Sequence, residues 1–221
     1  MAINKYSLKI NLKVRNMMDI SDNFKESPSQ TAGPYVHIGC TPNFIGIKDL
    51  FKGDLGSSMK FGPVKGEEIT LKGTVFDGNG EPLKDAMIEI WQADSSGFYN
   101  SPKETRGRAD PNFSGWGRCP VNLKTGLYKF DTVKPGRVPD REGILQAPHI
   151  TVWIVARGIN LGLHTRVYFP DEIKYNSSDP ILTRIIESKR ARTLLALKER
   201  KGLYKFDIHL QGSQETIFFD I

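Results

Sequence analysis

A short apolar run in the second half of the chain places the strongest constraint on the fold. Residues 150–156 read Ile-Thr-Val-Trp-Ile-Val-Ala, and the turn Lys134-Pro-Gly136 precedes them. A run this short, rich in β-branched and aromatic side chains, predicts a strand covered on both faces rather than a helix. His149 stands before the run and Arg157 directly after it. Because a polar side chain marks each end of a predicted buried strand, we expect the functional residues at these two ends.

Several other short strands are predicted along the chain. Turns rich in Gly, Pro, Asn and Asp separate them, and Asp77-Gly-Asn-Gly80 is a tight turn or hairpin of this kind. The other predicted strands span residues 69–76, 86–92, 126–132, 164–169, 193–199, 203–210 and 216–220. The pattern predicts a mainly-β protein, an antiparallel β-sandwich with long loops and one short C-terminal helix.

The remaining segments are assigned to loops, one helix and a tail. Three segments are rich in Gly, Pro and polar side chains. We predict an extended loop at 27–39, an irregular surface connection at 40–66 and a long polar excursion at 100–119. The short helix is predicted at 181–188, with Asp179 as its N-cap and Pro180 at its first position. The domain therefore spans residues 27–221, and residues 1–26 are predicted to be a flexible extension.

Charge and composition limit the possible partners. The net charge is +6, but the basic residues are scattered and acidic residues lie among them, so we expect a solvated surface and no nucleic-acid site. A basic surface favours an anionic ligand or an acidic partner subunit. No apolar run is long enough to span a membrane, and no signal peptide is predicted. Two cysteines, Cys40 and Cys119, favour a reducing, cytoplasmic location.

One spaced motif resembles a known family. Leu71-Lys-Gly-Thr-Val75, Gly80, Leu83, Ile88-Glu-Ile-Trp91 and Gly97-Phe-Tyr99 resemble the signature of intradiol ring-cleaving dioxygenases. The alternative is a generic transthyretin-like hairpin. Residues 113–119 and the 134–136 turn extend the resemblance. Residues 29–35 and 216–220 resemble the alpha subunit of a two-subunit member of the family.

The resemblance implies a ligand set that this chain has largely lost. Family members hold a non-haem ferric ion with two tyrosines and two histidines, and phenolates suit this hard ion. Val138 stands where the second tyrosine is expected, and Thr151 where the second histidine is expected. No tyrosine lies between Tyr99 and Asp110, and Thr105 falls near the first ligand position. His149 is the only retained ligand position, so we predict that this chain binds no metal and that His149 is satisfied by hydrogen bonds.

The same resemblance implies a role for the chain. The alpha subunit of such an enzyme is iron-free and helps to form an active site at its interface with an Fe(III)-binding beta subunit. The complex would cleave a small aromatic substrate, 3,4-dihydroxybenzoate, with O2 to 3-carboxy-cis,cis-muconate, and this chain alone would be inactive. The residues expected to form a wall of the substrate pocket are Thr31, Ala32, Gly33, Pro34, Tyr35 and Arg157.

Physical chemistry supports this assignment but leaves alternatives. A glycine at 33 lets backbone approach a ligand, Pro34 stiffens the loop, and the guanidinium of Arg157 matches a carboxylate. Arg157 is equally explained as a surface charge at a strand end or as part of an interface salt bridge. The whole chain is alternatively a metal-free binding or assembly module without a dioxygenase partner. A self-sufficient dioxygenase for catechol or hydroxyquinol is a further alternative, against which the missing ligands argue.

Overall fold

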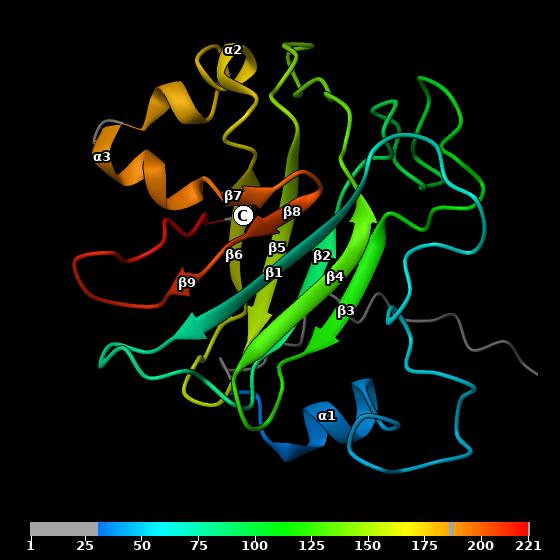
Figure 1. Ribbon diagram of the computed structural model, residues 1–221, viewed down its shortest axis with the longest axis vertical. Coiled ribbons are helices and arrows are strands. Elements are labelled where there is room, and N and C mark those ends of the chain that lie inside the picture. Colours follow the sequence, from blue (N-terminus) through cyan, green and yellow to red (C-terminus); the bar gives the residue numbers. More distant parts are fainter. Residues whose placement is uncertain (1–30, 186–187, 221) are drawn as a thin grey trace, which may run out of the picture.

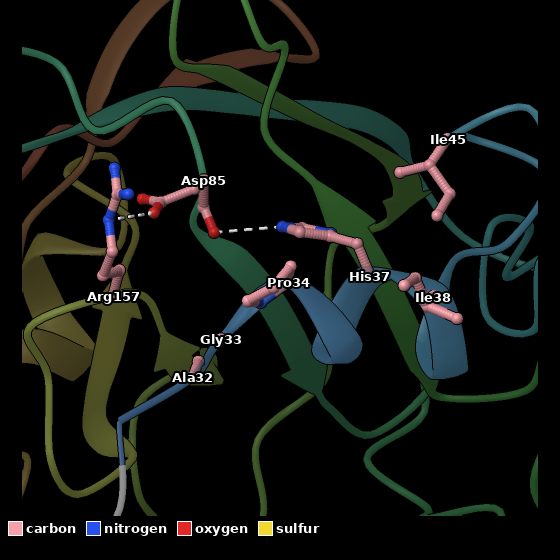
Figure 2. Close-up of a pocket in the computed structure, with 8 residues that line it drawn as sticks. All are labelled: Ala32, Gly33, Pro34, His37, Ile38, Ile45, Asp85 and Arg157. Atoms are coloured by element: carbon pink, nitrogen blue, oxygen red, sulfur yellow. Dashed lines mark hydrogen bonds and ion pairs between the residues drawn. The ribbon is translucent and has the colours of Figure 1, made fainter.

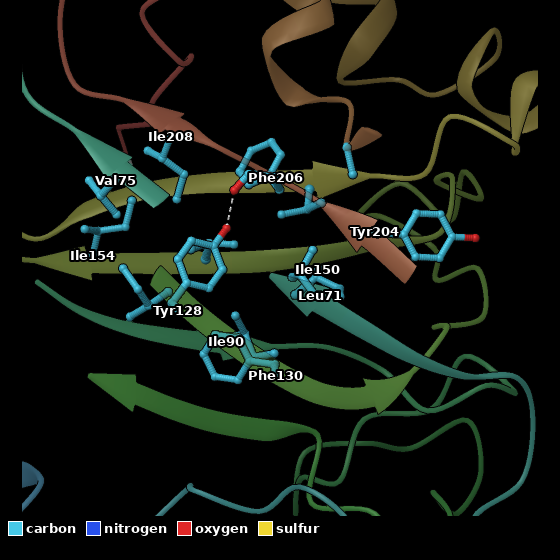
Figure 3. Close-up of a cluster of buried hydrophobic side chains, with 14 of the residues drawn as sticks. Leu71, Val75, Ile90, Tyr128, Phe130, Ile150, Ile154, Tyr204, Phe206 and Ile208 are labelled. Atoms are coloured by element: carbon cyan, nitrogen blue, oxygen red, sulfur yellow. Dashed lines mark hydrogen bonds between the residues drawn. The ribbon is translucent and has the colours of Figure 1, made fainter. Parts of the chain in front are cut away.

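Alternating burial along the strands builds two sheets that share one core. The computed structural model describes residues 31–185 and 188–220; the extension predicted at 1–26 lies outside them. In strand β1 (Glu68–Phe76), Ile69, Leu71, Gly73 and Val75 are buried, and the residues that alternate with them are half-buried or exposed. In β5 (His149–Val155), Ile150, Val152 and Ile154 are buried in the same way. The two inward faces meet, as Figure 3 shows for a cluster of these side chains.

The first sheet has the order β4-β1-β8-β7, and β9 also pairs with β1. Its other strands are β4 (Leu127–Val133), β7 (Leu197–Arg200), β8 (Leu203–Lys205) and β9 (Ile208–His209). The pairing of β1 with β4 is antiparallel, as predicted, whereas β8 and β9 run parallel to β1. This sheet is therefore mixed.

The second sheet has the order β3-β2-β5-β6 and is antiparallel throughout. It contains β2 (Met87–Trp91), β3 (Trp116–Pro120) and β6 (Leu163–Tyr168) beside β5. The side chains of β5 and β6 that do not face the core lie on the outer face of this sheet. Among them, Thr151 stands directly across from Arg166, and His149 stands directly across from Tyr168. This outer face and the ends of β5 therefore position the site. The predicted mainly-β sandwich is confirmed.

Two glycines of the family-like motif are explained by close packing. A Cβ atom at Gly73 would lie 1.8 Å from the carbonyl oxygen of Phe206, which accepts a hydrogen bond from the Tyr128 hydroxyl (Figure 3). Gly97 has φ +84°, and its Cβ would lie 2.2 Å from the carbonyl oxygen of Arg137. Both positions exclude a side chain, so the motif spacing reflects backbone contacts of this sandwich.

Some predicted strands differ from the observed ones. Strand β3 overlaps the end of the segment predicted as a polar excursion at 100–119, because it is an edge strand that tolerates Pro and Arg. The strand predicted at 216–220 is wrong: Thr216 N–H bonds to His209 and Phe219 N–H bonds to His164, so no continuous ladder forms. The strand predicted at 193–199 is shorter, since residues 192–194 form a 3-10 turn.

The helical segments also differ from the prediction. Residues 34–40 form α1 (Pro34–Cys40) rather than an extended loop, because Pro34 occupies the first helical position, where it is well tolerated. Near the C-terminus there are four short segments: α2 (Ile173–Asn176), η2 (Leu182–Arg184), α3 (Ser188–Ala191) and η3 (Arg192–Leu194). They lie at the opposite end of the molecule from α1 (Figure 1).

Asp179 explains how the segment predicted as a helix at 181–188 begins, and the backbone at Ile185 explains why it is short. One carboxylate oxygen accepts the N–H groups of Ile181 and Leu182, as an N-cap does. At Ile185 the backbone becomes extended, and this side chain packs against a small second hydrophobic cluster. The helical turn therefore ends early. No helix within residues 31–185 and 188–220 has the length and apolar character needed to cross a membrane.

Candidate functional site

A pocket of about 430 Å³ lies where β5 ends, next to the start of α1. Figure 2 shows the side chains that line it: Ala32, Gly33, Pro34, His37, Ile38, Ile45, Asp85 and Arg157. Arg157 and Asp85 lie on one side, His37 and Ile38 belong to α1, and residues 32–34 pass between them (Figure 2). The volume is within the range of pockets for small ligands.

Thr31 attaches the segment before α1 to the end of β5. Its hydroxyl accepts a hydrogen bond from the Gly158 N–H at 2.7 Å and donates to the Ala156 carbonyl oxygen at 3.4 Å. These two residues flank Arg157 in sequence. The segment at 31–34 and the arginine are therefore held together by backbone and hydroxyl groups, independently of any charge.

His37 and Asp85 fix the other side of the pocket. His37 is buried, and its Nε2 donates to the backbone carbonyl of Asp85 at 3.0 Å, which ties α1 to the segment preceding β2 (Figure 2). The Asp85 carboxylate lies 3.2 Å from Nε of Arg157. One aspartate thus contacts both elements of the pocket.

Arg157 remains largely accessible in spite of this ion pair. Its side chain is 82% exposed, and the ion pair with Asp85 is formed through Nε. An exposed pair of this kind contributes less than about 1 kcal/mol to stability. The two terminal nitrogens of the guanidinium have no hydrogen-bond partner among the described residues, so they are available to a ligand or a partner chain.

The predicted pocket residues are thus mostly close together. Ala32, Gly33, Pro34 and Arg157 line the pocket, and Thr31 anchors it. Tyr35 differs, because it is 81% exposed and does not line the pocket. Three lining side chains (Ile38, Ile45 and His37) and Asp85 were not predicted, since only the docking of α1 brings these distant residues beside Arg157.

The other end of β5 has a different environment. His149 is buried, its Nδ1 lies 2.8 Å from the Ala147 carbonyl oxygen, and its ring packs 5.6 Å from that of Tyr168. Burial lowers the pKa of His149 to about 4, and the positive charge of Arg166 adds to this effect. His149 therefore has a hydrogen-bond partner at the end of the strand, as predicted.

The residues around His149 do not fit a ferric ion. Val138 is buried and apolar, and Thr151 stands across from Arg166 in the sheet. In residues 31–185 and 188–220 there is no group of three or more His, Cys, Asp or Glu side chains that could hold a metal. A ferric ion requires anionic ligands, and here a guanidinium provides positive charge instead.

The protonation of His149 predicts an acid-sensitive stability. Its pKa is about 4 in the folded chain and about 6.5 in the unfolded chain, so between these values the unfolded chain binds more protons. Stability is present above pH 6.5 and is lost as the pH falls toward 4. Between pH 7 and pH 5 we expect a loss of about 2 kcal/mol in the free energy of unfolding, measured in urea.

His149→Gln is expected to remove most of this loss. The matched control is His164→Gln, which changes a half-exposed histidine of the same sheet and should leave the loss unchanged. If His149→Gln loses as much stability between pH 7 and pH 5 as the unsubstituted chain does, another group causes the acid sensitivity.

The chain is similar in sequence to known dioxygenases. A family model described as Dioxygenase matches residues 40–212. The protocatechuate 3,4-dioxygenase alpha chain of Pseudomonas putida is 40% identical over 198 residues, which cover 88% of this chain and 96% of that protein. The corresponding alpha chain of Burkholderia cepacia is 36% identical over 89% of this chain and 98% of its own length. The beta chain of the B. cepacia enzyme is 32% identical, over 72% of this chain and 71% of that protein.

Solved structures show the same fold at lower identity. The dioxygenase domain of a dioxygenase and carbohydrate-binding fusion from Streptomyces sp. SirexAA-E matches with a TM-score of 0.53 and 22% identity, over 85% of this chain and all of that one. The 3-chlorocatechol 1,2-dioxygenase of Rhodococcus opacus 1CP also matches with a TM-score of 0.53, at 18% identity over 73% of this chain and 68% of that one.

Proposed function

Because the chain belongs to the intradiol ring-cleavage dioxygenase family, we propose that it is the iron-free alpha subunit of a protocatechuate 3,4-dioxygenase. Its partner is a beta subunit that holds Fe(III), and the complex cleaves 3,4-dihydroxybenzoate with O2 to 3-carboxy-cis,cis-muconate. One observation carries the proposal: the chain keeps a pocket between residues 31–34 and Arg157 although the surroundings of His149 do not fit iron.

The pocket residues have distinct tasks in this proposal. The terminal nitrogens of Arg157, which no described residue occupies, bind the carboxylate of the substrate as a charge-assisted pair. Gly33 has no heavy atom within 4 Å of the position that a Cβ would take, so substrate or partner backbone can approach there. Pro34 and the Thr31 hydrogen bonds hold this wall in place and help to exclude water. The iron on the beta subunit would supply the chemistry with O2.

Exposed apolar side chains support a large partner interface. Within residues 50–61, four large hydrophobic side chains are exposed by 47% to 69%: Leu50, Phe51, Leu55 and Phe61. Groups of this kind on one segment mark an association surface more often than a solvated one. Both cysteines are free in the structure, which agrees with the proposed cytoplasmic location.

Co-expression with a beta-type chain tests the proposal. This chain expressed alone should be colourless and without stoichiometric iron, because both phenolate ligands are missing. With a beta chain that carries two tyrosines and a His-x-His pair, it should form a complex that contains iron and oxidises protocatechuate. The control replaces the beta chain's His-x-His pair and should abolish iron binding without preventing assembly. Iron and a visible band in this chain alone, or no association at micromolar concentration, would contradict the proposal.

A further inference from the structure

Arg166 is held by neutral groups on the outer face of the second sheet. Its Nη1 donates to Oε1 of Gln146 at 2.7 Å and to the Tyr168 hydroxyl at 3.3 Å, and its guanidinium carbon lies 5.9 Å from the centre of the Phe219 ring. Gln146 is only 6% exposed. An amide, a phenol and an aromatic ring therefore position the guanidinium, but none of them neutralises it.

The positive charge of Arg166 has no direct counter-charge among the described residues. Among residues 31–185 and 188–220, no carboxylate oxygen forms an ion pair with Arg166 within 4.0 Å. Asp179 is on the far side of the Tyr168 hydroxyl, and it already accepts that hydroxyl and the N–H groups of Ala147, Ile181 and Leu182. A half-buried charge without a partner is unfavourable. The pairing of an anion with Arg166 therefore releases more free energy than pairing with a fully solvated arginine.

A pocket of about 530 Å³ gives access to this charge. Arg166 and Gln146 line it, together with Arg141, Arg184, Asp140 and Glu142. Oε1 of Gln146 accepts from Arg166, which leaves its Nε2 donors without a described partner beside the guanidinium. The pocket thus combines a planar cation and an amide donor, and three arginines outnumber two carboxylates around it.

The charge of Arg166 also acts on the neighbouring aromatic and imidazole groups. Burial raises the pKa of the Tyr99 phenol, and the Arg166 charge opposes this rise. Burial lowers the pKa of His149, and the same charge adds to that effect. The potential on this side of the sheet is therefore positive where ionisable side chains are buried.

We propose that this pocket binds a small organic carboxylate through Arg166 and Gln146. A guanidinium presents paired N–H groups that match the two oxygens of a carboxylate, and the amide of Gln146 adds a further donor. A single excess positive charge suits a monoanion, and the two carboxylates at the rim disfavour multiply charged anions such as phosphate. This site is independent of the proposed function, because it uses neither Arg157 nor a partner chain.

Titration calorimetry on the full chain tests the site, with benzoate and inorganic phosphate as probes at constant ionic strength. We expect benzoate to bind with a dissociation constant of about 1 mM or lower, and phosphate at least about tenfold more weakly. Arg166→Gln should weaken benzoate binding at least about tenfold, because it removes charge-assisted hydrogen bonds. The matched control is Arg200→Gln, which alters an exposed arginine of β7 and should leave the affinity unchanged. All titrations are repeated in an Arg157→Ala background, which removes the guanidinium from the pocket at the other end of β5.

Gln146→Glu keeps the test decisive if Arg166→Gln does not fold. A carboxylate at this position would accept the same hydrogen bond from Arg166, pair with its charge and exclude the ligand. We expect this variant to keep the urea midpoint of the unsubstituted chain or exceed it, and to lose benzoate binding. The proposal is overturned if benzoate does not bind the unsubstituted chain, if the foldable variants bind it within twofold of normal, or if phosphate binds as tightly as benzoate.

Discussion

Arg157→Ala, in a hetero-oligomer of confirmed iron content, is expected to lower kcat/KM for protocatechuate by about ten- to a hundredfold. The two terminal nitrogens of Arg157 have no described partner in the chain, and we propose that they bind the substrate carboxylate. The loss of a hydrogen bond to a charged group corresponds to about 1.5–3 kcal/mol. Most of the decrease should come from a higher KM and little from a lower kcat, because the carboxylate is bound in the ground state as well as in the transition state.

The stability of the isolated chain separates this role from a structural one. Since the Arg157 side chain is 82% exposed, Arg157→Ala should change the free energy of unfolding by less than about 1 kcal/mol. Arg157→Lys should recover only part of the activity, because an ammonium lacks the paired donors of a guanidinium. Arg200→Ala is the matched control, at an exposed strand arginine outside the pocket. Unchanged kcat and KM in Arg157→Ala would assign this arginine to a surface or interface charge.

Gly33→Val and Asp85→Asn extend the same experiment. A Cβ at Gly33 meets nothing within 4 Å, so we expect the chain itself to accommodate valine, and a rise in KM would report crowding of the substrate. Asp85→Asn removes the charge beside Nε of Arg157 while the backbone contact of Asp85 with His37 is kept. We expect a smaller loss of kcat/KM than in Arg157→Ala, because Asp85 acts only by orienting the arginine.

Gly73→Ala should cause the largest loss of stability from a single methyl group. The added Cβ would lie 1.8 Å from the Phe206 carbonyl oxygen, 2.6 Å from its carbon and 2.8 Å from the Tyr128 hydroxyl. Phe206 cannot move away from β1 easily, because its N–H is bonded to the Lys72 carbonyl and its oxygen accepts from the Tyr128 hydroxyl, both within the first sheet. We expect a loss of about 3 kcal/mol or more, at the upper end of overpacking effects, in urea denaturation.

The control for Gly73→Ala is the same substitution at Gly39. Gly39 lies within α1, and a Cβ there has no neighbour within 4 Å. Alanine should therefore be neutral or stabilise the chain by about 0.5–1 kcal/mol, because it favours the helix. A Gly73→Ala variant as stable as the Gly39→Ala variant would show that the first sheet can widen at Gly73 at little cost.

The sandwich could be predicted because its strands carry their own pattern. Residues 69–76 alternate, and residues 150–156 are a short β-branched run, so both strands were predicted to within one or two positions. A strand was predicted at 216–220 because Ile217 and two phenylalanines suit one. Its pairing depends on where His164 and His209 lie in space. The helix α1 was missed because Pro34 is compatible with both a loop and the first turn of a helix.

The candidate sites show a similar limit. A resemblance pointed to residues 31–35 and Arg157, and the structure adds that Thr31 bonds directly to the turn that follows Arg157. The contact of Gln146 with Arg166 joins positions 20 residues apart on different elements. It depends on strand register and on how the 134–148 segment folds over the sheet. No local pattern carries that information.

The parallel pairing of β1 with β8 and β9 has a consequence for synthesis of the chain on the ribosome. One side of β1 is completed by residues 203–209, and the backbone of Thr74 is bonded to Asp207, 133 positions later. At about 5–20 residues per second, translation needs about ten seconds to produce that partner. Until then β1 has β4 on one side and an open row of backbone donors and acceptors on the other. During this period we expect that a neighbouring polypeptide on the same message can add to that edge, and the edge becomes paired only when residues 203–209 have emerged.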